Sequence, residues 1–146
     1  MEGKPLHTEN QKAVDYLLAQ TYSIRAFYYF TLYRAYGGVP IVKEVKVLNG
    51  AVEQSQLYTP RSTPKQVMDF IKADITKAFE YFASSGTEWT NNVTWSKAAT
   101  QMLAAEVYLW SAKVSLGDQV PAATDLTTAE GYLTEVKNNT KFGLLD

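Results

Sequence analysis

The chain has 146 residues, a formal net charge of −1 and no cysteine. A charge this close to zero creates no field that would attract nucleic acid or an anionic membrane, and the lack of cysteine excludes disulfides, cysteine metal ligands and a cysteine nucleophile. With 46% hydrophobic and 20% charged residues, the composition is that of one globular domain with a substantial core.

The first expected helix covers residues 9–36 and is crowded with aromatic side chains. Its apolar residues fall on more than one face, so we expect neighbouring elements to cover it on more than one side. Ala26 and Ala35 are the positions where another helix would approach closely. Residues 37–40, Gly-Gly-Val-Pro, then end the helix, because glycine allows positive φ and proline cannot continue a helix. A short strand near Val39 is expected to follow.

Residues 43–59 are expected to form a loop, and two further helices follow it. The second helix, residues 64–83, starts with a capping box between Thr63 and Gln66 and has proline in its first turn. Ser84-Ser85-Gly86 is expected to end the second helix. The third helix, residues 97–116, is expected to be capped by Ser96 and ended by Gly117.

The fourth helix is expected over residues 128–138. Residues 127–130, Thr-Thr-Ala-Glu, form another capping-box pattern, and three apolar residues should face inward: Tyr132, Leu133 and Val136. Periodicity therefore predicts an all-α chain of four main helices, with no sheet beyond the short strand near Val39.

Charged residues near apolar positions are interpreted as structural. Arg25 lies on the most apolar helix and needs a carboxylate or carbonyl partner, although a ligand contact is the alternative. Glu106 is expected to pair with Arg25 or Lys97. Three carboxylates of the second helix are expected to be surface charges rather than a catalytic pair: Asp69, Asp74 and Glu80.

The sequence predicts no catalytic residue, no metal site and no cofactor. His7 is the single histidine, so it cannot build a multi-histidine metal site, and no Ser-His-Asp arrangement is evident. We interpret His7 as a residue of an N-terminal loop.

The polar link before the third helix holds the residues best suited to a sugar. Trp89 and Trp95 offer flat rings for stacking, and Asn91 and Asn92 between them offer amide hydrogen bonds. These four residues are the predicted ligand-binding set. The alternative for Trp95 is structural, because it immediately precedes a helix cap and suits a staple that packs on the first turn.

Four blocks of sequence occur in an order typical of one family. They are Arg25-Ala26 with the aromatic run up to Val39-Pro40, then Pro60-Arg61-Ser62, then Ser96-Lys97-Ala98-Ala99 with Leu103–Leu109, and finally Lys141-Phe142-Gly143-Leu144-Leu145. In this order they resemble the SusD/RagB-like family of nutrient-binding lipoproteins on the outer membrane of Bacteroides-type bacteria.

The resemblance implies an all-α superhelix of tetratricopeptide-like helical hairpins. Because members of the family are several times longer and begin with a lipidated cysteine, residues 1–146 are expected to be one helical domain of a longer parent, a natural short relative being the alternative. The implied role is non-enzymatic: the parent binds a glycan or other nutrient at the cell surface and works with a TonB-dependent, SusC-like outer-membrane transporter. This segment would be mainly scaffold and transporter-facing surface, and on its own it would expose apolar surface that favours self-association.

Two other functions remain open. One is a helical-repeat adaptor that binds a protein and no sugar, although a clean 34-residue repeat is not visible. The other, and the weakest, is a carboxylate-based hydrolase, because sequence spacing does not place two carboxylates across a cleft.

Overall fold

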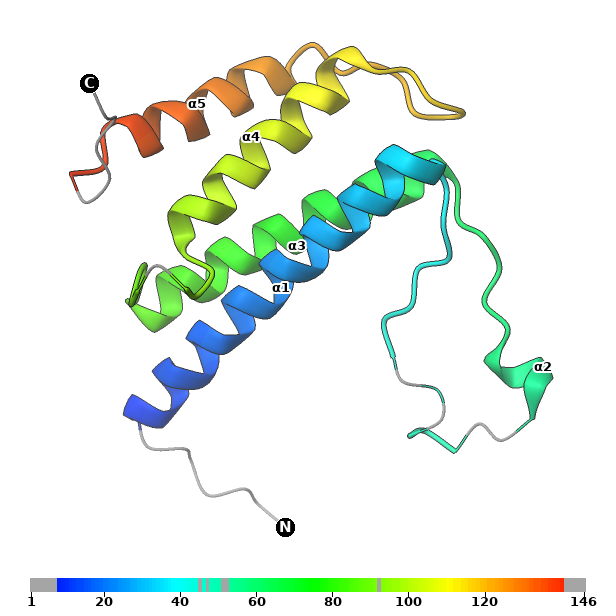
Figure 1. The fold of residues 1–146 in the computed structure, drawn as a ribbon, viewed down its shortest axis with the longest axis horizontal. Coiled ribbons are helices and arrows are strands. Elements are labelled where there is room, and N and C mark those ends of the chain that lie inside the picture. The colour runs from blue at the N-terminus through cyan, green and yellow to red at the C-terminus, as the bar shows by residue number, and fades with distance from the viewer. Residues whose placement is uncertain (1–7, 45, 47, 51–52, 92, 141–146) are drawn as a thin grey trace.

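The computed structural model describes residues 8–44, 46, 48–50, 53–91 and 93–140. Its helices are α1 (Thr8–Tyr36), α2 (Gln54–Leu57), α3 (Pro64–Ser85), α4 (Lys97–Lys113) and α5 (Asp125–Lys137). Figure 1 shows α1 and α3 antiparallel and side by side, with α4 and α5 forming a second hairpin beside them. The all-α class and the four main helices are confirmed, and α2 adds a single turn within the expected loop. None of the described helices is long and apolar enough to cross a membrane.

The core lies between α1 and α3 and is closed by α4. From α1 it takes Ala26, Phe30 and Tyr33, which are fully buried. The side chains that meet them are Val67, Ile71 and Ile75 from α3 and Leu103, Ala104 and Val107 from α4. Ala26 has no exposed surface and lies in this core, so the expectation that another helix approaches closely there is confirmed.

The outer side of α1 is more exposed than its apolar sequence suggests. Leu17 is 61% exposed, and Ile24 and Phe27 are also open to solvent. Ala35 is exposed as well. The expectation that α1 is covered on more than one side is therefore wrong for most of its length, because α3 covers one side and α4 reaches only part of the next.

Glycine is required at each of the two positions after α1 for a different reason. Gly37 has a φ of 69°, in the left-handed region that glycine tolerates best. Gly38 instead lies against another stretch of backbone: a Cβ added to Gly38 would be 2.2 Å from the carbonyl oxygen of Ser62. Only a residue without a side chain fits at that crossing.

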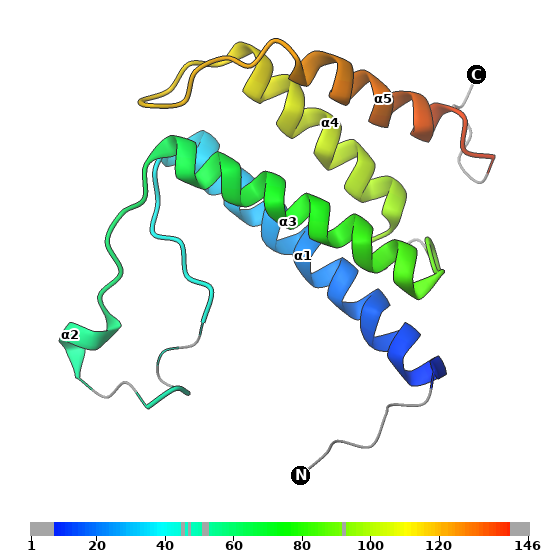
Figure 2. The same cartoon turned by 180° about the vertical axis from the view of Figure 1, so that it is seen from behind.

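The chain leaves α1 and returns to α3 at the same point, and the arm that contains α2 extends away from it, as seen from behind in Figure 2. The N–H of Ser62 donates to the carbonyl of Val39 at 3.2 Å, and Arg61 donates to the carbonyls of Tyr36 and Gly38. A single backbone bond does not make a ladder, so the strand expected near Val39 is not formed in the described part of the chain.

Most of the predicted helix ends are confirmed. The Thr63 hydroxyl accepts from the N–H of Gln66 while the Gln66 side chain accepts from the N–H of Thr63, which is the predicted capping box. Ser96 caps α4 by accepting from Ala99 at 3.1 Å, and Gly86 ends α3 with a φ of 66°.

Two predicted boundaries are wrong. The third helix ends at Lys113 rather than at residue 116, because Gly117 belongs to a separate tight turn in which Leu116 and Gln119 exchange backbone hydrogen bonds. The fourth helix begins at Asp125, before the expected capping box. The carboxylate of Asp125 pairs with Lys72 on α3, and this long-range contact outweighs the local capping signal.

The inward face of α5 is also narrower than predicted. Ala129 is its one buried residue among those described. Tyr132 does face inward, where its ring stacks on Phe79 with the ring centres 5.2 Å apart. Val136 is half-buried, but Leu133 is 39% exposed, so its predicted inward position is wrong.

Arg25 is structural, as expected, and its partner is Asp74. The guanidinium donates two hydrogen bonds of 2.7 Å to the carboxylate, which joins α1 to α3. Asp74 is 3% exposed, so the prediction that it is a surface charge is wrong. The hydrogen bond to Asp74 raises the pKa of Arg25 above its ordinary value.

The other three carboxylates discussed from the sequence lie at the surface. Asp69 and Glu80 are exposed and pair with lysines of their own helix, as predicted for surface charges. Glu106 pairs with Arg34 at 2.6 Å, and not with Arg25 or Lys97 as expected, because Arg25 is paired with Asp74 and Lys97 with Glu88.

Replacing Ala26 with leucine should overpack the contact between the helices and lower the free energy of unfolding by about 1–3 kcal/mol. The matched control is Ala35→Leu on the same helix, which adds the same atoms at an exposed position and should change stability little. Urea denaturation of both variants measures the difference. Equal midpoints for the two variants would show that Ala26 is not at a tight contact.

Arg25→Met should lower the free energy of unfolding by about 2–4 kcal/mol, because it leaves the Asp74 carboxylate buried without its partner. Lys77→Met removes a solvent-exposed pair with Glu80 and should change stability far less, because exposed ion pairs contribute little. Chemical denaturation at pH 7 compares the two. A loss for Arg25→Met no larger than for Lys77→Met would contradict a structural role for the buried pair.

Candidate functional site

The link between α3 and α4 is a closed loop, and this closure fixes where Trp89 stands. The N–H of Lys97 donates to the carbonyl of Glu88 at 2.9 Å. The side chains of the same two residues form an ion pair of 2.7 Å. Trp89 is therefore the first residue inside a loop whose two ends are joined both by backbone and by side chain.

Asn91 holds the turn of this link. Its side-chain oxygen accepts hydrogen bonds from the N–H groups of Val93 and Thr94, each at 2.9 Å. The hydroxyls of Thr90 and Thr94 add a bond of 2.8 Å across the same turn. The amide oxygen predicted to meet a sugar is thus occupied by the backbone. Asn92 lies outside the described residues, as do His7 and the block Lys141–Leu145.

Trp95 packs against helices rather than beside Trp89. Its indole N–H donates to the Thr100 hydroxyl at 2.9 Å, in the first turn of α4. Its ring lies 5.6 Å from that of Phe27 on α1, and its carbonyl accepts from Gln20 at 3.0 Å. This arrangement supports the alternative of a staple-like residue at the start of α4.

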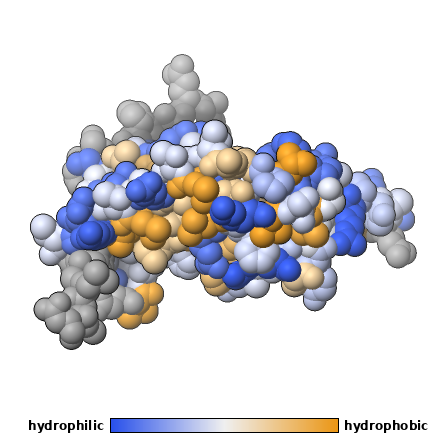
Figure 3. Space-filling model, turned by 90° about the horizontal axis from the view of Figure 1, so that it is seen from above, coloured by the Kyte–Doolittle hydropathy of each residue, from blue (hydrophilic) through white to orange (hydrophobic). Residues whose placement is uncertain are grey.

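The two predicted tryptophans line different hollows. Trp95 lines an apolar groove of about 410 Å³ between α1, α4 and α5, together with Phe27, Met102, Leu109 and Leu133. Apolar side chains also form an interrupted band across the face shown in Figure 3. Trp89 instead lines a polar cavity of about 370 Å³ between the start of α4 and the end of α5.

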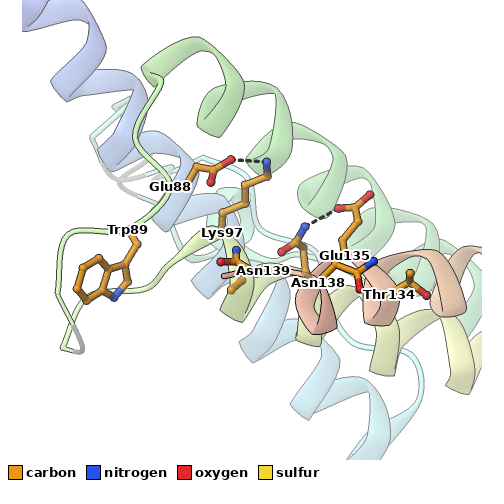
Figure 4. A pocket seen from close by; sticks show the side chains of 9 residues that line it. Glu88, Trp89, Lys97, Thr134, Glu135, Asn138 and Asn139 are labelled. Carbon is orange, nitrogen blue, oxygen red and sulfur yellow. Dashed lines mark hydrogen bonds and ion pairs between the residues drawn. The ribbon is translucent and has the colours of Figure 1, made fainter. Parts of the chain in front are cut away.

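The polar cavity lies between the link, the first turns of α4 and the end of α5. Figure 4 shows Trp89 on the link at one side, and at the other side Thr134 and Glu135 of α5 and Asn138 just after that helix. The α5 residues were not part of the predicted set. They reach the cavity because α5 runs back antiparallel to α4, and no local signal in residues 128–138 points to a ligand.

The charges of the cavity are held in place by neighbours. Gln101 is 5% exposed and donates its side-chain N–H to the carboxylate of Glu135. The Glu88–Lys97 pair forms the opposite wall. Indole, amides, a hydroxyl and carboxylates around one hollow can bind a polar ligand that also has an apolar face. No group of three His, Cys, Asp or Glu side chains suited to a metal ion occurs in the described ranges.

Replacing Asn91 with alanine should loosen the link, because two backbone N–H groups lose their acceptor. We expect faster amide hydrogen exchange at Val93 and Thr94 and a loss of stability of about 1 kcal/mol. Asn91→Asp is the control, since its carboxylate oxygen can accept the same two bonds. Unchanged exchange in Asn91→Ala would argue that the amide is not what holds the turn.

Comparison with known proteins gives matches over most of the chain. A SusD-like family model, described as starch-binding and associating with the outer membrane, matches residues 4–109. SusD-like protein P38 of Formosa agariphila is 29% identical over 111 residues, which make up 76% of this chain and 20% of that protein.

Solved structures give the same result for the fold. A SusD superfamily protein of Bacteroides fragilis is similar with a TM-score of 0.79 and 41% sequence identity, over 99% of this chain and 27% of its own. NanU of the same species is similar with a TM-score of 0.71 and 30% identity, over 99% of this chain and 26% of its own. The chain thus spans about a quarter of each structure, and from the family model and these similarities we conclude that it belongs to the SusD-like family.

Proposed function

We propose that this chain is the helical scaffold segment of a SusD-like protein that binds a glycan or other nutrient at the cell surface and passes it to a TonB-dependent outer-membrane transporter. The observation that carries the proposal is the similarity over 99% of the chain to about a quarter of a SusD superfamily structure. The description of the family, starch-binding and associating with the outer membrane, supports a glycan as ligand and the outer membrane as location.

The apolar groove supports a scaffold role for the segment. Phe27, Met102 and Leu109 are all substantially exposed along it. A contiguous apolar surface of this kind marks a place where protein packs on protein. In the proposed role, the groove and the outer side of α1 are covered by the remainder of the parent or by the transporter.

The proposal assigns no catalysis to this segment. Asp69 and Glu80 are in surface ion pairs with lysines, and the carboxylate of Asp74 is bound by Arg25. A glycoside hydrolase needs two carboxylates that face each other across the scissile bond, with one of them free to act as an acid. These three carboxylates are used for structure or solvation instead.

Calorimetric titration of the purified chain against starch, mannan and host-type glycans tests the scaffold role. We expect no binding in the micromolar range and no hydrolysis, because by the family resemblance the main glycan contacts come from elsewhere in the parent. Sedimentation at the same concentrations checks whether the apolar groove drives self-association. Micromolar binding that is abolished by Trp89→Ala or Trp95→Ala would overturn the scaffold role.

The cellular part of the proposal is tested in the bacterium that produces the protein. Affinity purification from detergent-extracted outer membranes should recover a TonB-dependent transporter with the protein that contains this chain. Recovery of the protein from the cytoplasmic fraction alone would contradict the proposal and favour the adaptor alternative.

A further inference from the structure

The outer face of α1 is exposed in this segment and yet carries no charged residue between Tyr16 and Tyr33. We propose that this face seats one further long helix of the same parent chain, which packs lengthwise on α1, and that it is not a surface for the transporter. The proposal deepens the proposed function and rests on it only in taking residues 1–146 as part of a longer SusD-like protein.

The exposed residues of this face have the spacing of a helix–helix seam. They alternate at intervals of three and four residues, all are exposed, and together they are called the seam here: Val14, Leu17, Thr21, Ile24, Tyr28, Thr31 and Ala35. Leu17 and Tyr28 are each 61% exposed. A stripe that repeats every 3.5 residues stays in contact with a second helix along its whole length, at a crossing angle of about 20°. A loop or a sheet edge would need no such repeat.

The two threonines of the seam are ready to be covered. The hydroxyl of Thr21 donates to the carbonyl of Leu17 at 2.8 Å, and that of Thr31 donates to the carbonyl of Phe27 at 3.0 Å. Each hydroxyl therefore has an acceptor within α1 itself. A helix can cover both threonines without leaving a buried donor unsatisfied.

The opposite side of α1 is already in the core. Ala19, Ala26 and Tyr33 follow one another at intervals of seven residues and have no exposed surface. The helix is thus apolar on two opposite sides, which is typical of a helix with neighbours on both. The seam is the side whose neighbour does not belong to the described part of the chain.

The composition of the face indicates permanent rather than transient contact. Surfaces that bind and release a partner are only about as apolar as the remaining surface, whereas permanent interfaces resemble a domain core. The exposed residues between Tyr16 and Tyr33 are all uncharged: Leu17, Thr21, Ile24, Phe27, Tyr28, Thr31 and Leu32. The chain covers 27% of the similar Bacteroides fragilis structure, so most of a protein of that length lies outside the segment and can supply a permanent neighbour.

The charges beside the seam also favour a helix of the same chain. Arg25 and Arg34 border it, and both are bound to carboxylates of this segment, Asp74 and Glu106. Helices from separate chains select their partner and direction through charges at such bordering positions. Because both arginines are already paired, the seam has little with which to select a separate chain, whereas a covalently linked helix needs no such selection.

The test is thiol labelling of the complete parent protein, purified without the transporter. This segment has no cysteine, so a single introduced cysteine reports on its own position. Thr21→Cys probes the seam, and Thr76→Cys is the matched control, because Thr76 is an exposed threonine of α3 whose hydroxyl also donates to the carbonyl four residues earlier. Maleimide should react at least about tenfold more slowly with Thr21→Cys than with Thr76→Cys, and equally with both in urea.

Photo-crosslinking then tests whether the neighbour is one long helix. Crosslinkers placed at Leu17 and at Tyr28 are roughly 16 Å apart along α1. Both should link to a single segment of the parent, at positions about eleven residues apart, because the two helices have the same rise per residue. Links to two unrelated segments would contradict a lengthwise helix.

Three labelling results would overturn the proposal, provided that both cysteine variants keep the circular dichroism spectrum of the parent. Protection of Thr21→Cys only after the transporter is added would assign the seam to the transporter. Protection that disappears on dilution, together with a dimer in sedimentation, would assign it to a second copy. Equal labelling under all conditions would show an uncovered face. The glycan titration and the recovery of the transporter do not depend on the seam, so failure of the proposed function is seen separately.

Discussion

The bidentate contact between Arg25 and Asp74 is the constraint on which the remaining arrangement depends. A carboxylate that is 3% exposed must keep its partner, so α1 cannot slide or rotate on α3 without leaving a buried charge unpaired. The rings of Tyr22 and Phe70 lie 5.0 and 4.9 Å from the guanidinium carbon and exclude other positions for it. The apolar core by itself would tolerate a shift along the helices far better than this pair does.

Once α1 and α3 are aligned, the position of the second hairpin follows. Ser23 on α1 shares a buried hydrogen bond of 2.8 Å with Thr100 on α4, and Gln20 holds the carbonyl of Trp95 just before that helix. The link is therefore held to α1 through Trp95, and its two ends are held together by the pair between Glu88 and Lys97. The cavity beside Trp89 inherits its shape from these contacts, of which only the Glu88–Lys97 pair lines the cavity itself.

What could be predicted from the sequence was local or periodic. The aromatic helix, its glycine stop and the caps at Thr63 and Ser96 depend on residues a few positions apart, and all are found in the structure. The start of α5 was missed because a pair between Asp125 and Lys72, far apart in sequence, decides it. Asp74 was misjudged for the same reason: only the approach of α1 turns a polar helix position into a buried one.

The candidate site shows the same division. Trp89 was identified because an aromatic residue in a polar link is unusual, but Asn91 turned out to brace its own turn. Glu135 and Asn138 could not be identified from the sequence, because they come close to the link only when the second hairpin folds back on it. Trp95 does not line the cavity beside Trp89. Its indole N–H and its carbonyl are both hydrogen-bonded to helix residues, Thr100 and Gln20.

The crossing of Gly38 and Ser62 has a consequence for how proteins of this design can diversify. The arm between these residues starts and finishes at one closed junction, so its length does not affect how α1 and α3 pack. The entropy of closing such a loop rises slowly, by about 0.6 kcal/mol for each doubling of its length. The arm can therefore be lengthened, shortened or replaced without disturbing the helix pair, whereas Gly38 at the junction has no room for a side chain.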